Sequence, residues 1–188
     1  MHFYSLLHQH PNTVITDQPT DTFRAGVAIV LREDDHICMI RRATKNTDYW
    51  SGHMGFPGGR EESRDSNLLQ TAIRETQEEI SLNLHPHQYQ LRLPDMKHSH
   101  LQVSGFVFAL PSTVEYELIP DPKEVAKIHW LSLHDFLKPD LRSTRVADYK
   151  GQTWNMPVVH IGEADVWGIS LYFIEHLLRI LQGKEQIL

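Results

Sequence analysis

The stretch that decides the fold joins GGREE at residues 58–62 to RETQEEI at residues 74–80. Glu75, Glu78 and Glu79 stand at positions i, i+3 and i+4 of the second segment. In an α-helix, where successive residues are rotated by about 100°, this spacing places all three carboxylates on one stripe. Like charges so close destabilise an isolated helix by about 0.2–0.5 kcal/mol per pair. The stripe is therefore either a solvated acidic face or a site for a hard divalent cation such as Mg²⁺ or Mn²⁺, which prefers oxygen ligands.

The surrounding sequence favours the cation. Residues 59–82 resemble the box of the Nudix hydrolases, which has a glycine, five residues, a glutamate, seven residues and then an Arg-Glu-x-x-Glu-Glu core. Gly59 matches the leading glycine, Asp65 stands where the first glutamate belongs, and Arg74 opens the core. An apolar strand, a Gly-Gly turn and a helix provide the context that such a motif requires.

The match departs from the family pattern at three places. Eight residues, rather than seven, separate Asp65 from Arg74. Thr76 fills an apolar position, and Ser81 replaces a late glycine. The coenzyme A pyrophosphatase branch of the family carries the same extra residue, so the resemblance points to that branch.

The resemblance implies an α/β fold, namely a Nudix-type α/β/α sandwich with a mixed sheet and a metal-binding box helix. It also implies an enzyme, a pyrophosphohydrolase that acts on a phosphoanhydride with Mg²⁺ or Mn²⁺ as its cofactor. A divalent ion would neutralise phosphate oxygens and lower the pKa of its bound water. We assign the metal ligands to Glu75, Glu78 and Glu79.

Catalytic roles are assigned to Glu78, Glu79, Arg74 and Glu124. The general base is one of the helix carboxylates or a glutamate brought by a loop, and the sequence leaves the choice open. Arg74 stands four residues before Glu78 and is expected to hold that carboxylate by an ion pair. Glu124, in PKEV at residues 122–125, precedes an expected strand and is a candidate for an additional ligand or base.

Substrate-binding roles are assigned to Arg42, Trp50, Gly58 and Gly59. The glycines permit a close backbone approach to the active centre. Trp50 lies in a loop next to the box and is a candidate to stack on a base. Arg42 matches the first arginine of the coenzyme A pyrophosphatase signature if the loop is one residue longer.

Other positions of that signature differ. Gly52 and Phe56 match in spacing, but Asp48 stands in place of a second arginine, Trp50 in place of a histidine and His53 in place of a glutamine. An acid at position 48 would repel a phosphate that an arginine would bind. Coenzyme A, acyl-CoA or dephospho-CoA is the favoured substrate. The alternatives are ADP-ribose, dinucleotides or nucleoside triphosphates, and a domain that binds a nucleotide without catalysis.

Composition describes the class of protein. The 188 residues are 40% hydrophobic and 22% charged, as in one globular enzyme domain. The formal charge of -6 argues against a nucleic-acid surface. The Nudix resemblance implies a small-molecule nucleotide as the partner. We expect no signal peptide and no membrane association. The single cysteine, Cys38, suits a reducing compartment, and the expected location is cytoplasmic. The oligomeric state stays open, with a homodimer as one option.

The expected organisation is an arm at residues 1–22 and one Nudix domain at residues 23–188 that includes an amphipathic C-terminal helix. The box helix is expected to begin at Asp65 or Ser66 and to end before Pro86. Its inner face is predicted to be Leu69, Ala72, Ile73 and Ile80. The other expected elements are strands at 23–31, 37–41, 53–57, 101–110 and 128–131 and a helix from Val166 onward. The histidine pairs His85 and His87, and His98 and His100, lack the spacing of a structural zinc site.

Overall fold

The protein is described by a computed structural model that covers residues 2–8, 22–44, 50–98, 100–149 and 151–184. Its centre is an eight-stranded sheet in which the order β3-β2-β1-β7-β5 is extended by β4 on β1, β6 on β7 and β8 on β2. β1 and β7 run parallel, whereas the other pairs are antiparallel, so the sheet is mixed. The strands are β1 (Phe23–Arg32), β2 (His36–Arg42), β3 (Met54–Gly55), β4 (Gly58–Arg60), β5 (Tyr89–Arg92), β6 (Met96–His98), β7 (Leu101–Leu110) and β8 (Val125–Ser132).

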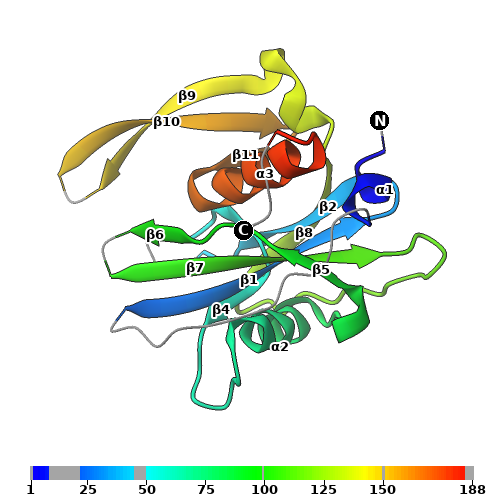
Figure 1. The fold of residues 1–188 in the computed structure, drawn as a ribbon. Coiled ribbons are helices and arrows are strands. Elements are labelled where there is room, and N and C mark those ends of the chain that lie inside the picture. Colours follow the sequence, from blue (N-terminus) through cyan, green and yellow to red (C-terminus); the bar gives the residue numbers. More distant parts are fainter. Residues whose placement is uncertain (1, 9–21, 45–49, 99, 150, 185–188) are drawn as a thin grey trace.

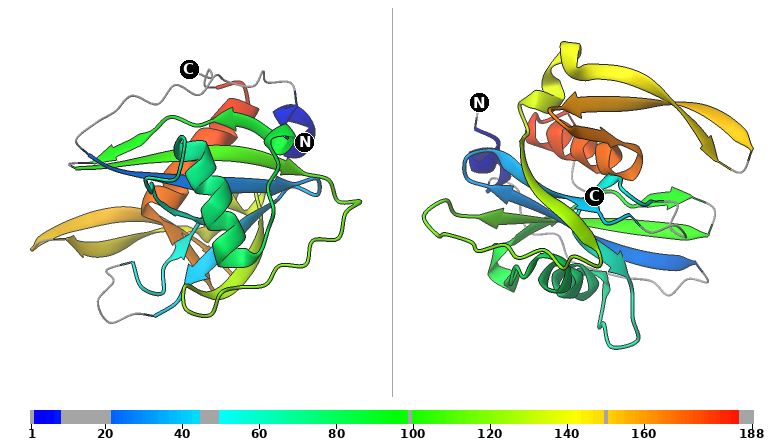
Figure 2. Two further views of the ribbon diagram at one scale, coloured as in Figure 1. Left: turned by 90° about the horizontal axis from the view of Figure 1, so that it is seen from below. Right: turned by 180° about the vertical axis from the view of Figure 1, so that it is seen from behind.

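Helices cover both faces of this sheet. α2 (Leu68–Ile80) lies on one face and α3 (Gly168–Leu181) on the other, as Figures 1 and 2 show. The layers form the predicted α/β/α sandwich, and the fold class is confirmed.

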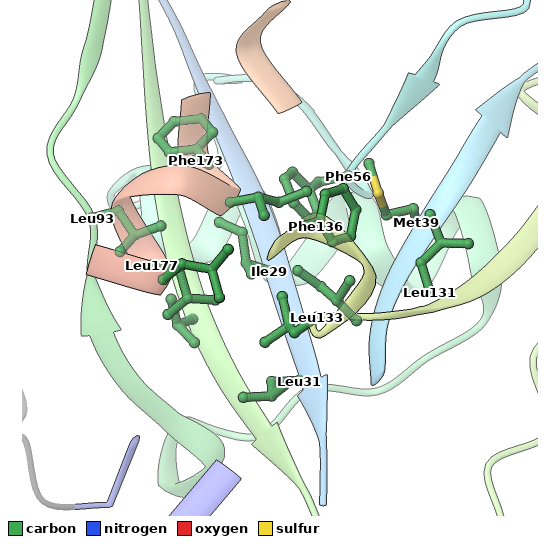
Figure 3. Close-up of a cluster of buried hydrophobic side chains, with 14 of the residues drawn as sticks. Ile29, Leu31, Met39, Phe56, Leu93, Leu131, Leu133, Phe136, Phe173 and Leu177 are labelled. Atoms are coloured by element: carbon green, nitrogen blue, oxygen red, sulfur yellow. The ribbon is translucent and has the colours of Figure 1, made fainter. Parts of the chain in front are cut away.

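Side chains of β1 alternate between the two layers. Ala28 and Val30 belong to the buried cluster that includes α2, whereas Ile29 and Leu31 belong to the cluster that includes α3. Figure 3 shows Ile29 and Leu31 on the same side as Phe173 of α3. A central strand buried on both faces reads as a continuous apolar run, which is why residues 28–31 are AIVL.

A second, three-stranded antiparallel sheet has the order β11-β10-β9. Its strands are β9 (Arg142–Tyr149), β10 (Gln152–Ile161) and β11 (Ala164–Trp167). The β9–β10 hairpin extends past α3, away from the main sheet (Figure 1). Val159 and Val166 join the α3 cluster, and Arg142 pairs with Glu175 of α3 at 2.9 Å. These contacts attach the second sheet to the outer side of α3.

Two predicted helix starts were wrong. α2 begins after Asn67, whose side-chain oxygen accepts the backbone N–H of Gln70 at 3.0 Å, so the cap is Asn67 and not Asp65 or Ser66. The second error concerns the C-terminal helix, since Val166 still belongs to β11. The extended backbone of Trp167 and the left-handed Gly168 (φ 60°) then turn the chain into α3.

Other boundaries also shift. α2 ends at Ile80 because Ser81 is left-handed (φ 57°), and β8 is longer at both ends than the predicted 128–131. Short 3-10 helices are η1 (Pro86–Gln88), η2 (Asp135–Leu137) and η3 (Pro139–Leu141).

The expected N-terminal arm includes α1 (Phe3–Leu7). Phe3 and Leu7 are buried in the α3 cluster, and the Tyr4 N–H donates to Asp35 Oδ1 at 2.8 Å. Residues 3–7 therefore pack as part of the domain core, while the division at residue 22 stays a prediction. Of the helices in the described ranges, none has the length and apolar character needed to cross a bilayer.

Candidate active site

A cleft of about 810 Å³ opens between α2, β4 and the start of α3. We call two sets of its lining side chains the carboxylate group, which is Glu75, Glu79 and Glu124, and the aromatic group, which is Trp50, His53 and Trp167. Arg42, Gly58 and Gly59 also line the cleft.

The carboxylate group combines two residues of the box helix with one residue of a distant loop. One oxygen from each of Glu75, Glu79 and Glu124 lies within 4.8 Å of the others. The loop that delivers Glu124 is tied to the end of α2. The Asp121 N–H donates to the Glu79 carbonyl at 2.9 Å, and the Ile119 N–H donates to the Ile80 carbonyl at 3.1 Å. Main-chain hydrogen bonds thus hold the third carboxylate beside the other two.

Glu79 is only 1% exposed. Burial raises its pKa to about 8, and the charges of Glu75 and Glu124 add to this effect. The Gly58 N–H, which donates to Glu79 Oε2 at 2.9 Å, and the charge of Arg42 act in the opposite direction. Burial also raises the pKa of Glu75.

This donor set fits a hard divalent cation. Three carboxylates converge, and the most buried of them is unfavourable in its charged form without further compensation. Oxygen ligands are those that Mg²⁺ and Mn²⁺ prefer. The described residues contain one group of three or more His, Cys, Asp or Glu close enough to share an ion, and it is this one. The histidine pairs are not part of this group.

Both positions of the turn require glycine for steric reasons. A Cβ on Gly59 would lie 2.5 Å from the Glu75 carboxyl carbon. A Cβ on Gly58, whose φ is +152°, would lie 2.4 Å from the Gly26 carbonyl oxygen. The turn thus packs directly against the carboxylate of Glu75 and against β1, which is the close backbone approach expected of these glycines. Their role in binding substrate stays a prediction.

Arg74 links several acids. Its guanidinium donates to both carboxylate oxygens of Asp65 at 2.9 Å, to Glu75 at 2.8 Å and to Glu78 at 2.9 Å. The expected ion pair with Glu78 is thus present. The Arg74 hydrogen bond lowers the pKa of Asp65 to about 2. Arg74 orients Glu75 while Asp65 fixes Arg74 from the other side.

Glu78 is placed differently from the other two box glutamates. It lines the cleft, but its side chain is 48% exposed and pairs with Arg64 at 3.0 Å as well as with Arg74. The structure brings Glu75 and Glu79 of the predicted trio together, and Glu124, not Glu78, completes the group. The assignment of Glu78 as a ligand or base stays a prediction.

The departures Thr76 and Ser81 are accommodated locally. Thr76 is fully buried, and its hydroxyl donates to the Ala72 carbonyl at 2.7 Å, which satisfies the polar group at an apolar position. Ser81 takes the left-handed conformation for which a glycine is favoured.

The aromatic group is assembled from two parts of the chain. The His53 ring lies 5.9 Å from the Trp50 ring and 5.0 Å from the Trp167 ring, centroid to centroid, in edge-to-face arrangements. Position 48, where an acid was expected to repel phosphate, lies outside the described residues. The sequence did not single out Trp167 as a site residue, because its place beside His53 depends on a contact with a distant segment.

The remaining histidines lie elsewhere. His98 and His100 are not among the residues that line the cleft, and His100 is exposed. His85 and His87 stack with ring centroids 5.5 Å apart beside a second cavity of about 450 Å³.

The family follows from comparison with known proteins. The model of the NUDIX domain matches residues 22–149, so the chain belongs to the NUDIX family. It is 28% identical over 159 residues to Nudix hydrolase 15, mitochondrial, of Arabidopsis thaliana, which covers 78% of this chain and 54% of that protein. It is 33% identical over 117 residues to an uncharacterised protein of Schizosaccharomyces pombe, which covers 57% of this chain and 35% of that protein. The chain thus spans about half of the first of these relatives and about a third of the second.

Other similar proteins extend the comparison. An uncharacterised Nudix hydrolase of Yersinia pestis is 24% identical over 152 residues, which covers 80% of this chain and 75% of that protein. A MutT/nudix family protein from Enterococcus faecalis has the same fold, with a TM-score of 0.53, 15% identity and coverage of 96% of this chain and 66% of that one. A UDP-X diphosphatase likewise gives a TM-score of 0.53 at 16% identity, with coverage of 92% of this chain and 68% of that one.

Proposed function

We propose that this protein is a divalent-cation-dependent hydrolase that cleaves a phosphoanhydride in a nucleoside diphosphate-linked small molecule. The observation that carries the proposal is the carboxylate group of Glu75, Glu79 and Glu124, gathered within 4.8 Å in the cleft of a NUDIX domain. A divalent cation would offset these converging negative charges further than the charge of Arg42 near Glu79 and the Arg74 hydrogen bond to Glu75 do.

The side chains would divide the work as follows. Glu75, Glu79 and Glu124 would hold the cation, which when bound would neutralise phosphate oxygens and activate water. Arg74 keeps Glu75 oriented, and the Gly58 N–H aims the Glu79 carboxylate into the cleft. Arg42, beside Glu79, supplies a positive charge for a phosphate. Glu78, Glu79 and Glu124 remain the candidate general bases.

Coenzyme A, acyl-CoA or dephospho-CoA is the substrate class we favour, because the box carries the extra residue of the coenzyme A pyrophosphatase branch. A cleft of about 810 Å³ is large enough for a nucleotide with a second group attached. ADP-ribose, a dinucleotide or a nucleoside triphosphate is the alternative. A domain that only binds nucleotide is the second alternative, and the assembled carboxylate group argues against it. We retain the cytoplasm as the expected location.

A substrate panel tests the proposal. Purified protein would be assayed with Mg²⁺ and with Mn²⁺ on coenzyme A, dephospho-CoA, ADP-ribose, diadenosine compounds and nucleoside triphosphates, with Glu79→Gln as the inactive control. We expect cation-dependent cleavage at an anhydride, and one ¹⁸O atom from labelled water in a product phosphate. Activity on phosphate monoesters alone, or turnover in the presence of a chelator, would contradict the proposal.

A further inference from the structure

Trp167 stands where the second sheet meets α3. It is the last residue of β11, it precedes the left-handed Gly168, and its side chain lines the cleft together with Ile169. The ring therefore belongs to the same cavity as the carboxylate group, although it comes from a different sheet.

The second sheet contacts this ring through Arg145. The guanidinium carbon of Arg145, on β9, lies 4.2 Å from the centre of the Trp167 ring. Trp167 pairs with Val158 on β10, and Val158 pairs with Ser143 on β9, so Arg145 reaches the ring diagonally from two residues further along. Among the described residues the cleft is lined by Trp167 and not by Arg145.

The ring also meets His53. The two rings contact edge to face with centroids 5.0 Å apart and an interplanar angle of 65°. Trp167 thus contacts both a cation from the hairpin and an imidazole from the loop before β3. An aromatic ring held in this way is pre-organised, so it loses little rotational freedom when a ligand binds.

Polar contacts across all three strands make the support firm. Ser143 Oγ on β9 lies 2.7 Å from His160 Nε2 on β10, and His160 Nδ1 lies 2.7 Å from Asp165 Oδ1 on β11. The order Ser-His-Asp is that of a hydrolytic triad. All three residues are exposed, and neither cavity described above contains them, so a bridge between strands is the better interpretation.

We infer that Trp167 is the stacking surface for the nucleobase of the substrate, and that Arg145 is a positioning residue that holds the Trp167 ring in place. The inference rests on the proposed function, because it places the base in the same cleft as the anhydride. It makes the β9–β10 hairpin part of the binding site, because Arg145 of β9 contacts the Trp167 ring. Trp50, which the sequence offered for base stacking, contacts His53 and lies one ring further from this support.

The test measures binding of adenosine 5′-monophosphate and ribose 5-phosphate, which share a phosphorylated ribose and differ in the base. Stacking of a base on an aromatic ring corresponds to about 5- to 150-fold in affinity. We expect Trp167→Ala to weaken binding of the nucleotide by tenfold or more and binding of the sugar phosphate by less than twofold. Trp154→Ala is the matched control, because Trp154 lies on β10 of the same hairpin, is exposed and does not line the cleft.

The role of Arg145 is tested by comparing a substitution that removes its charge with one that keeps it. Arg145→Ala should weaken nucleotide binding about three- to tenfold and raise KM with little change in kcat, and Arg145→Lys should restore most of the loss because the cation is kept. Nucleotide-induced quenching of tryptophan fluorescence should be lost in Trp167→Phe more than in Trp50→Phe. An unchanged nucleotide affinity in Trp167→Ala, or equal losses for both ligands, would overturn the inference.

Failure of the proposed function would look different. If the protein binds the nucleotide through Trp167 but cleaves no anhydride with any divalent cation, the stacking inference stands and the catalytic proposal fails. If hydrolysis depends on the carboxylate group and Trp167→Ala leaves KM unchanged, the catalytic proposal stands and the stacking inference fails.

Discussion

The carboxylate group and the aromatic group share one cleft but are held by different forces. Glu79 is buried, and burial disfavours its charged form. The fold nevertheless keeps it in the cleft, where its carboxylate accepts a main-chain hydrogen bond from Gly58. The aromatic group is held by a ring contact of 5.9 Å between Trp50 and His53 in one loop, and by a ring contact of 5.0 Å between His53 and Trp167, more than a hundred residues apart. Substitutions in the first group should therefore change kcat and cation affinity, and substitutions in the second should change KM.

The largest expected effect is that of Glu79→Gln. It should lower kcat on the order of 10²-fold or more, since loss of a ligand or base generally does so. KM should change little, because the aromatic group is untouched. Glu78→Gln, at the exposed carboxylate, should cost less than Glu79→Gln, and steady-state kinetics at saturating Mg²⁺ would compare the two.

The stability of Glu79→Gln separates function from folding. Glu79 was not among the residues predicted for the inner face of the helix, but it is 1% exposed. A glutamine keeps an acceptor for the Gly58 N–H and avoids any cost of burying a charge, so the free energy of unfolding should stay equal or rise. A large loss of stability would mean that the charge itself holds the fold together.

Gly59→Ala should lower kcat about tenfold or more by a steric route. The new Cβ would lie 2.5 Å from the Glu75 carboxyl carbon, so the carboxylate must move out of its group. Gly55→Ala is the matched control, since a Cβ there meets nothing within 4 Å. Equal kcat values for the two variants would contradict the packing described for Gly59.

Asp65→Asn tests the support behind Arg74 through the pH dependence of stability. The pKa of Asp65 is lowered from 3.8 to about 2, chiefly by its hydrogen bond to Arg74. The charged Asp65 therefore stabilises the folded protein above pH 4, and this stabilisation is lost as the pH falls toward 2. We expect Asp65→Asn to cost about 2 kcal/mol at pH 7 and the difference from the wild type to shrink below pH 4.

Asp34→Asn is the control for this experiment. The pKa of Asp34 is also lowered to about 2, by Arg32, but that side chain is 44% exposed. Solvent screening should reduce its contribution well below that of Asp65. Chemical denaturation from pH 2 to pH 7 would measure both, and a pH-independent difference for Asp65→Asn would rule out the ion pair as the cause.

The smallest effect is expected at the end of α2. Ser81→Gly should raise the free energy of unfolding by about 0.5–1 kcal/mol, because Ser81 has a φ of 57° that costs a side-chain-bearing residue more than a glycine. Asp35→Gly provides the contrast. Its φ is 60°, but its carboxylate accepts the Tyr4 N–H, so that substitution should destabilise. Thermal unfolding would show whether the two changes have opposite signs.

The two groups also differ in how far the sequence predicts them. Glu75 and Glu79 follow from helical spacing, which is local, and the position of Glu124 before β8 was a weaker local signal. Trp167 depends on the register of β11 against β10 and β9, which no local pattern specifies. The β9–β10 hairpin was not predicted because its strands are largely polar and exposed and because Pro157 lies within β10, where a proline argues against a strand.

Cation binding measures the central claim most directly. Mn²⁺ would be titrated into the wild type and into Glu79→Gln, Glu124→Gln and Glu78→Gln, with the bound ion followed by electron paramagnetic resonance. We predict that Glu79→Gln and Glu124→Gln each weaken Mn²⁺ binding by tenfold or more and that Glu78→Gln weakens it by less than about threefold. Mn²⁺ affinities that are equal in all four proteins, or a loss confined to Glu78→Gln, would contradict the carboxylate group as the cation site.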